Sequence, residues 1–153
     1  MLRDERLTPE SIRQGQVNVL LVAGKTPDIL IRRSLVRDSD IHIADRLMYN
    51  AKKFRKFLAK PDDRYDVVVF EGDNLSDSWL NGHEGMQLAS VIKIRKPDLP
   101  VILVSSTLDL ETLKSGFNLG IDNMFHRALF FGDQEEEHKG LWLVDAVKKS
   151  ASK

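Results

Sequence analysis

The chain has 153 residues, of which 42% are hydrophobic and 30% are charged, as in a globular protein with one packed domain. Its 23 lysines and arginines balance its 23 aspartates and glutamates, which argues against general electrostatic attraction to nucleic acid or to anionic membranes. Cysteine is absent, which excludes disulfides and thiolate metal sites, and the chain shows neither an apolar signal segment nor a membrane-spanning run, so we expect a cytoplasmic protein.

Strand-like and helix-like patterns alternate along the chain. The predicted strands are short apolar runs, at residues 17–23, 41–44, 65–70, 99–104 and 121–125. The predicted helices carry apolar residues at helical spacing, at residues 26–36, 46–60, 85–96, 110–119 and 135–149. We expect Gly120 to cap the fourth of these helices at its C-terminus.

This order of five strand–helix units predicts an α/β fold. Several of the strand runs are continuously apolar, as expected of strands that are covered on both faces. We therefore expect a flavodoxin-like, doubly wound parallel sheet of five strands, (βα)5, with helices on both faces. The domain should span residues 17–149, after an N-terminal extension at 1–16 and before a tail at 150–153.

Three polar residues close three successive predicted strands. Glu71 ends the run that begins at Asp66, Ser105 ends the next strand, and Arg127 follows the last one. Because the carboxyl ends of parallel strands meet at one edge, an acid, a hydroxyl and a base should converge there. This is the edge at which open α/β folds bind their ligands.

The chain from Val17 to Lys149 resembles the receiver domain of bacterial response regulators. The segments that carry the resemblance are 66–71 (DVVVFE), 83–85 (HEG), 96–105 (KPDLPVILVS) and 119–127 (LGIDNMFHR). In that family the third strand ends in a phosphate-accepting Asp, the fourth in Thr or Ser, and the fifth in Lys. A pair of acids after the first strand holds Mg²⁺. The resemblance implies the same fold and a role in signalling.

The sequence departs from the family pattern at the positions that carry its chemistry. Glu71 stands at the phosphoacceptor position, Arg127 at the Lys position, and Met124 at the position of the aromatic switch residue. The acidic pair falls on Ala23 and Gly24, which offer no carboxylate oxygen to a hard cation. Phosphoryl transfer depends on that cation, so we expect a pseudo-receiver with no enzymatic activity, no metal and no cofactor.

Such a module would act through protein–protein contacts, in two-component signalling or transcriptional regulation. In receivers the usual partner or dimer surface is built from the fourth helix, the fifth strand and the last helix. We therefore expect a protein partner, or a homodimer, to bind there through Met124, Phe130, Phe131 and Trp142. The aromatic residues could instead be buried where the last helix meets the sheet.

Three further interpretations remain open from the residues. Glu71 could pair with Arg127 and Ser105 and hold an active-like state permanently. Alternatively the chain is a true receiver that accepts phosphate at an unusual residue such as Asp73. A third reading is a flavodoxin-like protein that binds a small anion or nucleotide at the loops 24–26 and 105–107.

The predicted second helix is rich in lysine and arginine. The cations there are Arg46, Lys52, Lys53, Arg55, Lys56 and Lys60. We interpret them as the solvated face of an amphipathic helix, whose stems cover apolar neighbours, and expect no nucleic-acid binding by this domain alone.

Overall fold

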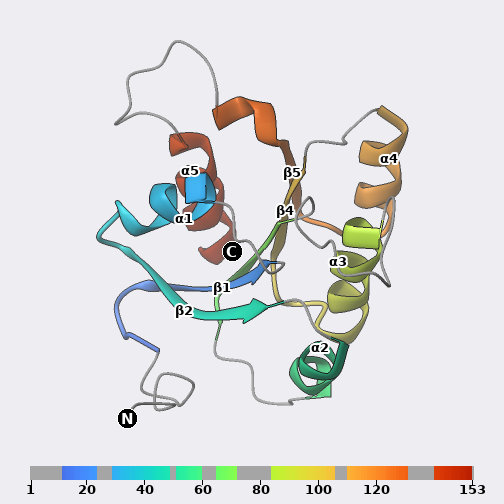
Figure 1. The fold of residues 1–153 in the computed structure, drawn as a ribbon, viewed down its shortest axis with the longest axis horizontal. Coiled ribbons are helices and arrows are strands. Elements are labelled where there is room, and N and C mark those ends of the chain that lie inside the picture. The colour runs from blue at the N-terminus through green and yellow to red at the C-terminus, as the bar shows by residue number, and fades with distance from the viewer. Residues whose placement is uncertain are drawn as a thin grey trace.

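A computed structural model describes residues 12–23, 29–48, 51–59, 65–71, 84–105, 110–130 and 140–152. Its centre is a parallel sheet with the strand order β2-β1-β3-β4-β5 (Figure 1). The strands are β1 (Val17–Ala23), β2 (Ile41–Met48), β3 (Val67–Glu71), β4 (Val101–Ser105) and β5 (Asn123–His126). This order is that of a flavodoxin-like doubly wound sheet, which confirms the predicted fold class.

Helices cover both faces of the sheet, as predicted. They are α1 (Ile29–Val36), α2 (Ala51–Ala59), α3 (Glu84–Arg95), α4 (Leu110–Asn118), the short 3-10 helix η3 (Arg127–Phe130) and α5 (Leu141–Ala151). In Figure 1, α1 and α5 lie on one side of the sheet, and α2, α3 and α4 lie on the other.

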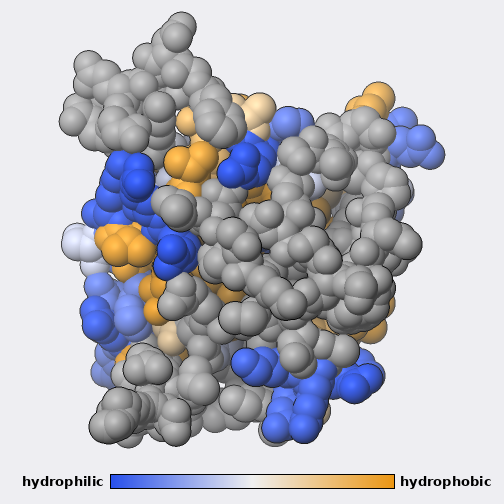
Figure 2. Space-filling model, in the orientation of Figure 1, coloured by the Kyte–Doolittle hydropathy of each residue, from blue (hydrophilic) through white to orange (hydrophobic). Residues whose placement is uncertain are grey.

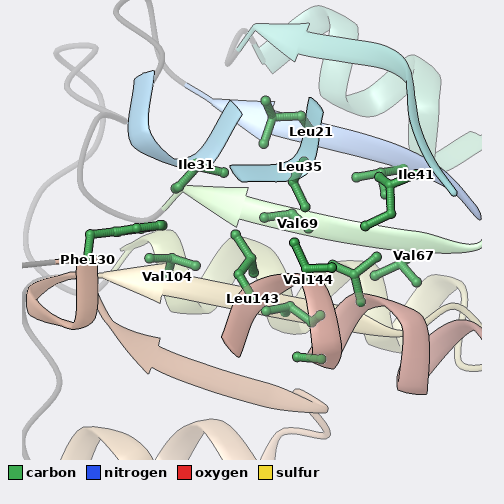
Figure 3. Packing of buried hydrophobic residues seen from close by; sticks show 14 residues of the cluster. Leu21, Ile31, Leu35, Ile41, Val67, Val69, Val104, Phe130, Leu143 and Val144 are labelled. Carbon is green, nitrogen blue, oxygen red and sulfur yellow. The ribbon is translucent and has the colours of Figure 1, made fainter. Parts of the chain in front are cut away.

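The strands divide their side chains between two buried clusters. In β3, Val67 and Val69 pack toward α1 and α5, whereas Val68 and Phe70 pack toward α2, α3 and α4. All four side chains are fully buried, which explains the unbroken apolar run in the sequence. Figure 3 shows the first cluster, with residues of α1, α5 and η3 meeting on the sheet.

The boundary between β2 and α2 differs from the prediction. β2 continues to Met48 instead of ending at 44, and α2 begins at Ala51 instead of 46. Pairing with β1 extends over the whole of β2, and the register shifts so that Val19 lies opposite Ile43 and Leu20 opposite Asp45. The backbone hydrogen bonds of this bulged ladder outweigh the helical apolar pattern that begins near Arg46.

The ends of α4 and α5 each depend on a glycine. Gly120 has a φ of +94°, and the N–H of Ile121 donates to the carbonyl of Gly116, as in a Schellman motif, so the predicted C-cap is confirmed. Gly140 has a φ of +85°, which stops a helix from passing through it, so α5 begins at Leu141 and not at 135. The helix also runs past the predicted end at Lys149 to Ala151, with Ser150 buried, so any tail begins after that turn.

Candidate functional site

Glu71 and Ser105 are the last residues of β3 and β4, and Arg127 follows β5 directly. The register sets Glu71 opposite Val104 and Ser105 opposite His126, so the three residues lie at nearly the same level along the strands. The structure therefore brings them to one edge of the sheet, as the sequence indicated. This edge includes the ends of β1 and β3, where the strand order reverses and doubly wound folds bind ligands.

The two strand-end residues of the edge are buried. Glu71 is 1% exposed and Ser105 is 5% exposed. Strand alternation places Glu71 with Val67 and Val69 on the α1/α5 face, and places Ser105 with Val101 and Leu103 on the opposite face. The two side chains thus share an edge but not a face.

A buried carboxylate requires compensation by hydrogen bonds or by an opposite charge. Glu71, Ser105 and Arg127 each take part in a hydrogen bond or an electrostatic contact. Arg127 comes from η3, whose last residue, Phe130, packs in the α1/α5 cluster on the same face as Glu71. The topology therefore allows Glu71 and Arg127 to form an ion pair.

The end of β1 carries no chemistry for a cation. Ala23 is the last residue of β1, one residue after Val22, which lies opposite Phe70 of β3. Gly24, the second expected metal position, lies outside the described residues, as do Asp73 and the loops 24–26 and 106–107. Within the described part of the chain, no three His, Cys, Asp or Glu side chains lie together as a metal site.

His126 is a residue of this edge that the sequence reading missed. It pairs with Ser105 across the β4–β5 ladder, so both side chains lie on the same face. Its Nδ1 accepts a hydrogen bond of 3.0 Å from the N–H of Ala128, so a neutral ring carries its hydrogen on Nε2. In this tautomer Nε2 has no lone pair to take a proton from Ser105, which argues against a serine–histidine dyad. The sequence could have indicated His126 only if the ends of β4 and β5 had been aligned with each other in register.

The side chains predicted to form an interface are largely core residues. Phe130 is 1% exposed and Met124 is 8% exposed. Both side chains therefore belong to the packed interior and are not available for contact with a partner. Trp142 is half-buried, with its ring 4.7 Å from that of Phe125 and 4.8 Å from that of Phe130 between ring centroids. Phe131 lies outside the described residues.

Other apolar side chains are exposed on the same elements. They are Leu110 and Phe117 of α4, Leu129 of η3, and Leu141 of α5. The alternative that the aromatic residues are buried therefore holds for Phe130, which packs in the α1/α5 cluster, while strand alternation in β5 turns Met124 toward the cluster on the other face.

At the opposite edge of the sheet, a half-buried lysine joins neighbouring elements. Lys93 Nζ lies 3.0 Å from Asp122 Oδ2, and it donates to the carbonyls of Pro97 and Leu99. Asp122 Oδ2 also accepts a hydrogen bond from the N–H of Val101. These contacts join α3 to the starts of β4 and β5. Because this cluster has a structural role, the carboxyl edge remains the candidate functional site.

No protein-family model matches the sequence, and no curated protein matches it. Solved structures match the fold. A response regulator from Thermotoga maritima is 16% identical with a TM-score of 0.61, and the match covers 90% of this chain and 99% of that one. The receiver domain of the Francisella response regulator 1452 is 17% identical with a TM-score of 0.62, and the match covers 90% and 98%.

NtrX from Brucella abortus is similar over one part of its length. It is 21% identical with a TM-score of 0.60, and the match covers 88% of this chain but 27% of that one. This chain therefore has the fold of response regulator receiver domains, which confirms the resemblance in its sequence at the level of fold. None of its described helices has the length and apolar character needed to cross a membrane.

Proposed function

We propose that this protein is a phosphorylation-independent, receiver-like signalling module that acts through protein–protein contacts and has no enzymatic activity. The observation that carries the proposal is that β1 ends at Ala23, while β3 beside it ends at the buried Glu71. A receiver that accepts phosphate needs acids there to hold the cation that neutralises the transferred phosphoryl group. Here the end of β1 is aliphatic, and the neighbouring carboxylate is a buried Glu.

The chemistry of Glu71 favours a carboxyl edge that is held permanently in one state over an edge that is switched by phosphorylation. Its side chain is one methylene longer than that of Asp, and at 1% exposure water has little access to it. Arg127 can direct two donors onto one carboxylate, which Lys cannot. A fixed ion pair at this edge would replace the transient interactions that a phosphoryl group makes.

An amide NMR titration with Mg²⁺ and then beryllofluoride, which mimics an acyl phosphate, tests the proposal. We expect no shifts at Ala23, Glu71 or Ser105 at millimolar Mg²⁺. Shifts that cluster at these residues or at Asp73 would instead establish a working receiver with altered chemistry. A parallel thermal-shift measurement with nucleotides and flavins would reveal a small-ligand protein by a raised midpoint.

The contact surface of the proposed module is the face built by α4, η3 and the start of α5. Leu110 and Phe117 are one heptad apart and lie on the same side of α4, and both are exposed. Leu129 and Leu141 are exposed on η3 and at the first turn of α5. Exposed apolar side chains of this kind are suited to a partner that covers them, whether another protein or a second copy of the chain.

A further inference from the structure

We propose that His126 is a pH-responsive cap of η3. Protonation of its ring releases the hydrogen bond that closes the first turn of this helix and loosens the turn at the carboxyl edge. His126 is the last residue of β5, and η3 begins at the next residue. The loosening of η3 is a property of the chain by itself and does not depend on the proposed function.

The side chain of His126 occupies the N-cap position of η3. Its Nδ1 accepts a hydrogen bond of 3.0 Å from the N–H of Ala128, the second residue of the helix. An acceptor on the N-cap side chain that receives this N–H is the usual closure of a first helical turn. The residues that usually supply it are Ser, Thr, Asp and Asn, whose side chains do not gain a proton near neutral pH. A histidine in this place makes the cap depend on pH.

Protonation reverses the role of the Nδ1 atom. In the neutral ring Nδ1 is an acceptor, whereas both nitrogens of a protonated imidazole are donors. A protonated Nδ1 and the N–H of Ala128 would be two donors facing each other, so the hydrogen bond cannot form. The positive ring would also lie at the N–H end of η3, where a cation is unfavourable, and would adjoin the cation Arg127 in the chain. Histidine as a residue type changes its charge between about pH 5 and 8, so the change falls within a physiological range.

The described surroundings of His126 hold no acid that binds its ring. His126 is exposed, and within the described part of the chain its one hydrogen bond is the cap. Ser105, opposite on β4, is neutral, and Glu71 lies on the other face of the sheet. The remaining charged residues of the described elements packed around β5 and η3 are Glu111 and Lys114 of α4, Arg127 of η3, and Asp145, Lys148 and Lys149 of α5.

Release of the cap acts on the N-terminal end of η3, because the other end is anchored. Phe130, the last residue of η3, is buried, and its ring lies 4.8 Å from that of Trp142 between centroids. Figure 3 shows Phe130 reaching from η3 into the buried cluster of α1 and α5. The opening is therefore confined to the three residues between the cap and this anchor, Arg127, Ala128 and Leu129.

The residues that would be released belong to the parts of the molecule discussed above. The cap closes a turn around Arg127, so it fixes the backbone of that residue at the carboxyl edge. Leu129 is exposed and belongs to the apolar face of α4, η3 and α5. Figure 2 shows apolar side chains in the upper part of the view, where η3 and the start of α5 lie in Figure 1. Acidification would therefore weaken partner binding at this face, a consequence that rests on the proposed function.

NMR spectroscopy of the full chain between about pH 8 and pH 5 tests the proposal. The HN–Hα scalar couplings of Arg127, Ala128 and Leu129 report φ, and unlike chemical shifts they do not respond to the charge of a nearby ring. They are small for the φ values of a 3-10 helix. We expect them to rise as the pH falls, with the same midpoint as the ring signals of His126, while the coupling of the anchored Phe130 stays constant.

Two replacements of His126 separate the cap from its protonation. His126→Asn keeps a cap that does not titrate, so its couplings should stay small throughout the pH range. His126→Ala removes the cap, so its couplings should be raised already at the high-pH end and should not change with pH. The matched control is His42→Asn, which replaces the other described histidine, on β2, and should respond as the wild type does. Circular dichroism should show that all three variants fold.

The proposal is overturned if the wild-type couplings stay constant while the His126 ring titrates. It is also overturned if His126→Asn responds to pH as the wild type does, since another titrating group would then be responsible, or if His126→Ala keeps small couplings at the high-pH end. None of these measurements needs a partner, so the proposed function and the cap can fail separately.

Discussion

At the scale of single residues, the question is whether Glu71 and Arg127 act as a pair. If the two side chains pair, removing the charge of Glu71 leaves the guanidinium of Arg127 in a half-buried position without a counter-charge. We therefore expect Glu71→Gln to lower the free energy of unfolding by about 1–3 kcal/mol. Urea unfolding at pH 7 measures the loss, and Glu111→Gln, at an exposed position on α4, is the control.

A double-mutant cycle separates the pair from other effects of Glu71. We expect Glu71→Gln and Arg127→Gln together to cost less than the sum of their separate costs, by about 0.5 kcal/mol or more. Strict additivity would show that the two side chains do not interact. The hypothesis of a permanent active-like state would also fail if Glu71→Gln left both the amide spectrum and partner affinity unchanged.

Gly140 is a residue whose replacement has a specific structural cost. A Cβ at this position would overlap the hydroxyl of Ser34 and approach the ring of Phe130, and the backbone φ is +85°. Gly15 has nearly the same φ, +83°, but a Cβ there would meet no atom within 4 Å. Gly15→Ala should therefore cost about 1–2 kcal/mol for the left-handed conformation alone. Gly140→Ala should cost a further 1–3 kcal/mol or so for overpacking.

Urea unfolding of the two glycine variants under identical conditions measures this difference. Equal losses for Gly15→Ala and Gly140→Ala would mean that α1 and α5 can move apart at this point without cost. The result would then weaken the view that Gly140 sets the close approach of α5 to Ser34.

At the scale of elements, an ion pair joins α5 to the turn between α1 and β2. Lys148 Nζ lies 2.8 Å from Asp38 Oδ2 and 3.4 Å from Asp40 Oδ2. The hydrogen bond from Lys148 lowers the pKa of the Asp38 carboxyl below its ordinary value of 3.8. The hydrogen bond to Asp38, with a smaller contribution from Asp40, raises the pKa of Lys148 above 10.5.

The pH dependence of stability follows from the direction of these pKa shifts. A carboxyl with a lowered folded-state pKa stabilises the fold above its unfolded-state pKa and loses this effect as pH falls through the folded value. A lysine with a raised pKa stabilises the fold below its unfolded-state pKa and loses this effect as pH rises through the folded value. We expect Asp38→Asn to lower the urea midpoint at pH 7, with the difference from wild type shrinking as pH falls below the ordinary carboxyl pKa of 3.8.

Urea midpoints from about pH 2 to pH 8 would measure this effect, with Asp98→Asn, at an exposed position, as the control. A difference between Asp38→Asn and wild type that stayed constant down to the lowest pH would exclude the ion pair as its cause. The pair is partly exposed to solvent, so the difference should also shrink as salt is added.

At the scale of the whole molecule, the apolar side chains of α4, η3 and α5 predict self-association or partner binding. We expect light scattering to show a dimer that is weakened by Leu141→Glu and by Phe117→Arg. Each replacement places a charge that suits the dipole at its end of the helix, so folding should be preserved. The controls are Val36→Glu and Ile94→Arg, which are exposed apolar residues on α1 and α3.

A monomer at all concentrations would exclude the homodimer and direct attention to a different protein partner. If the controls weakened association as much as Leu141→Glu and Phe117→Arg, the face would lie elsewhere.

Much of the fold could be predicted because each local pattern has one physical solution. The unbroken apolar run at β3 requires burial on both faces, and the order of strand and helix patterns requires parallel pairing. The start of α2 could not be predicted, because the segment from Asp45 to Met48 has a helical pattern but gains ladder hydrogen bonds only beside β1. The start of α5 required knowledge that Gly140 adopts a left-handed conformation against Ser34.

The sequence by itself determined which residues reach the carboxyl edge, because strand ends in a parallel sheet are set by where apolar runs stop. It also determined that the end of β1 offers no acid, since the side chain of Ala23 carries no oxygen. Only the tertiary structure decided which side chains are buried there and which face each one occupies. Pairing with neighbouring strands sets that choice, and it placed His126 beside Ser105, buried Phe130 and Met124, and left the cations of α2 exposed.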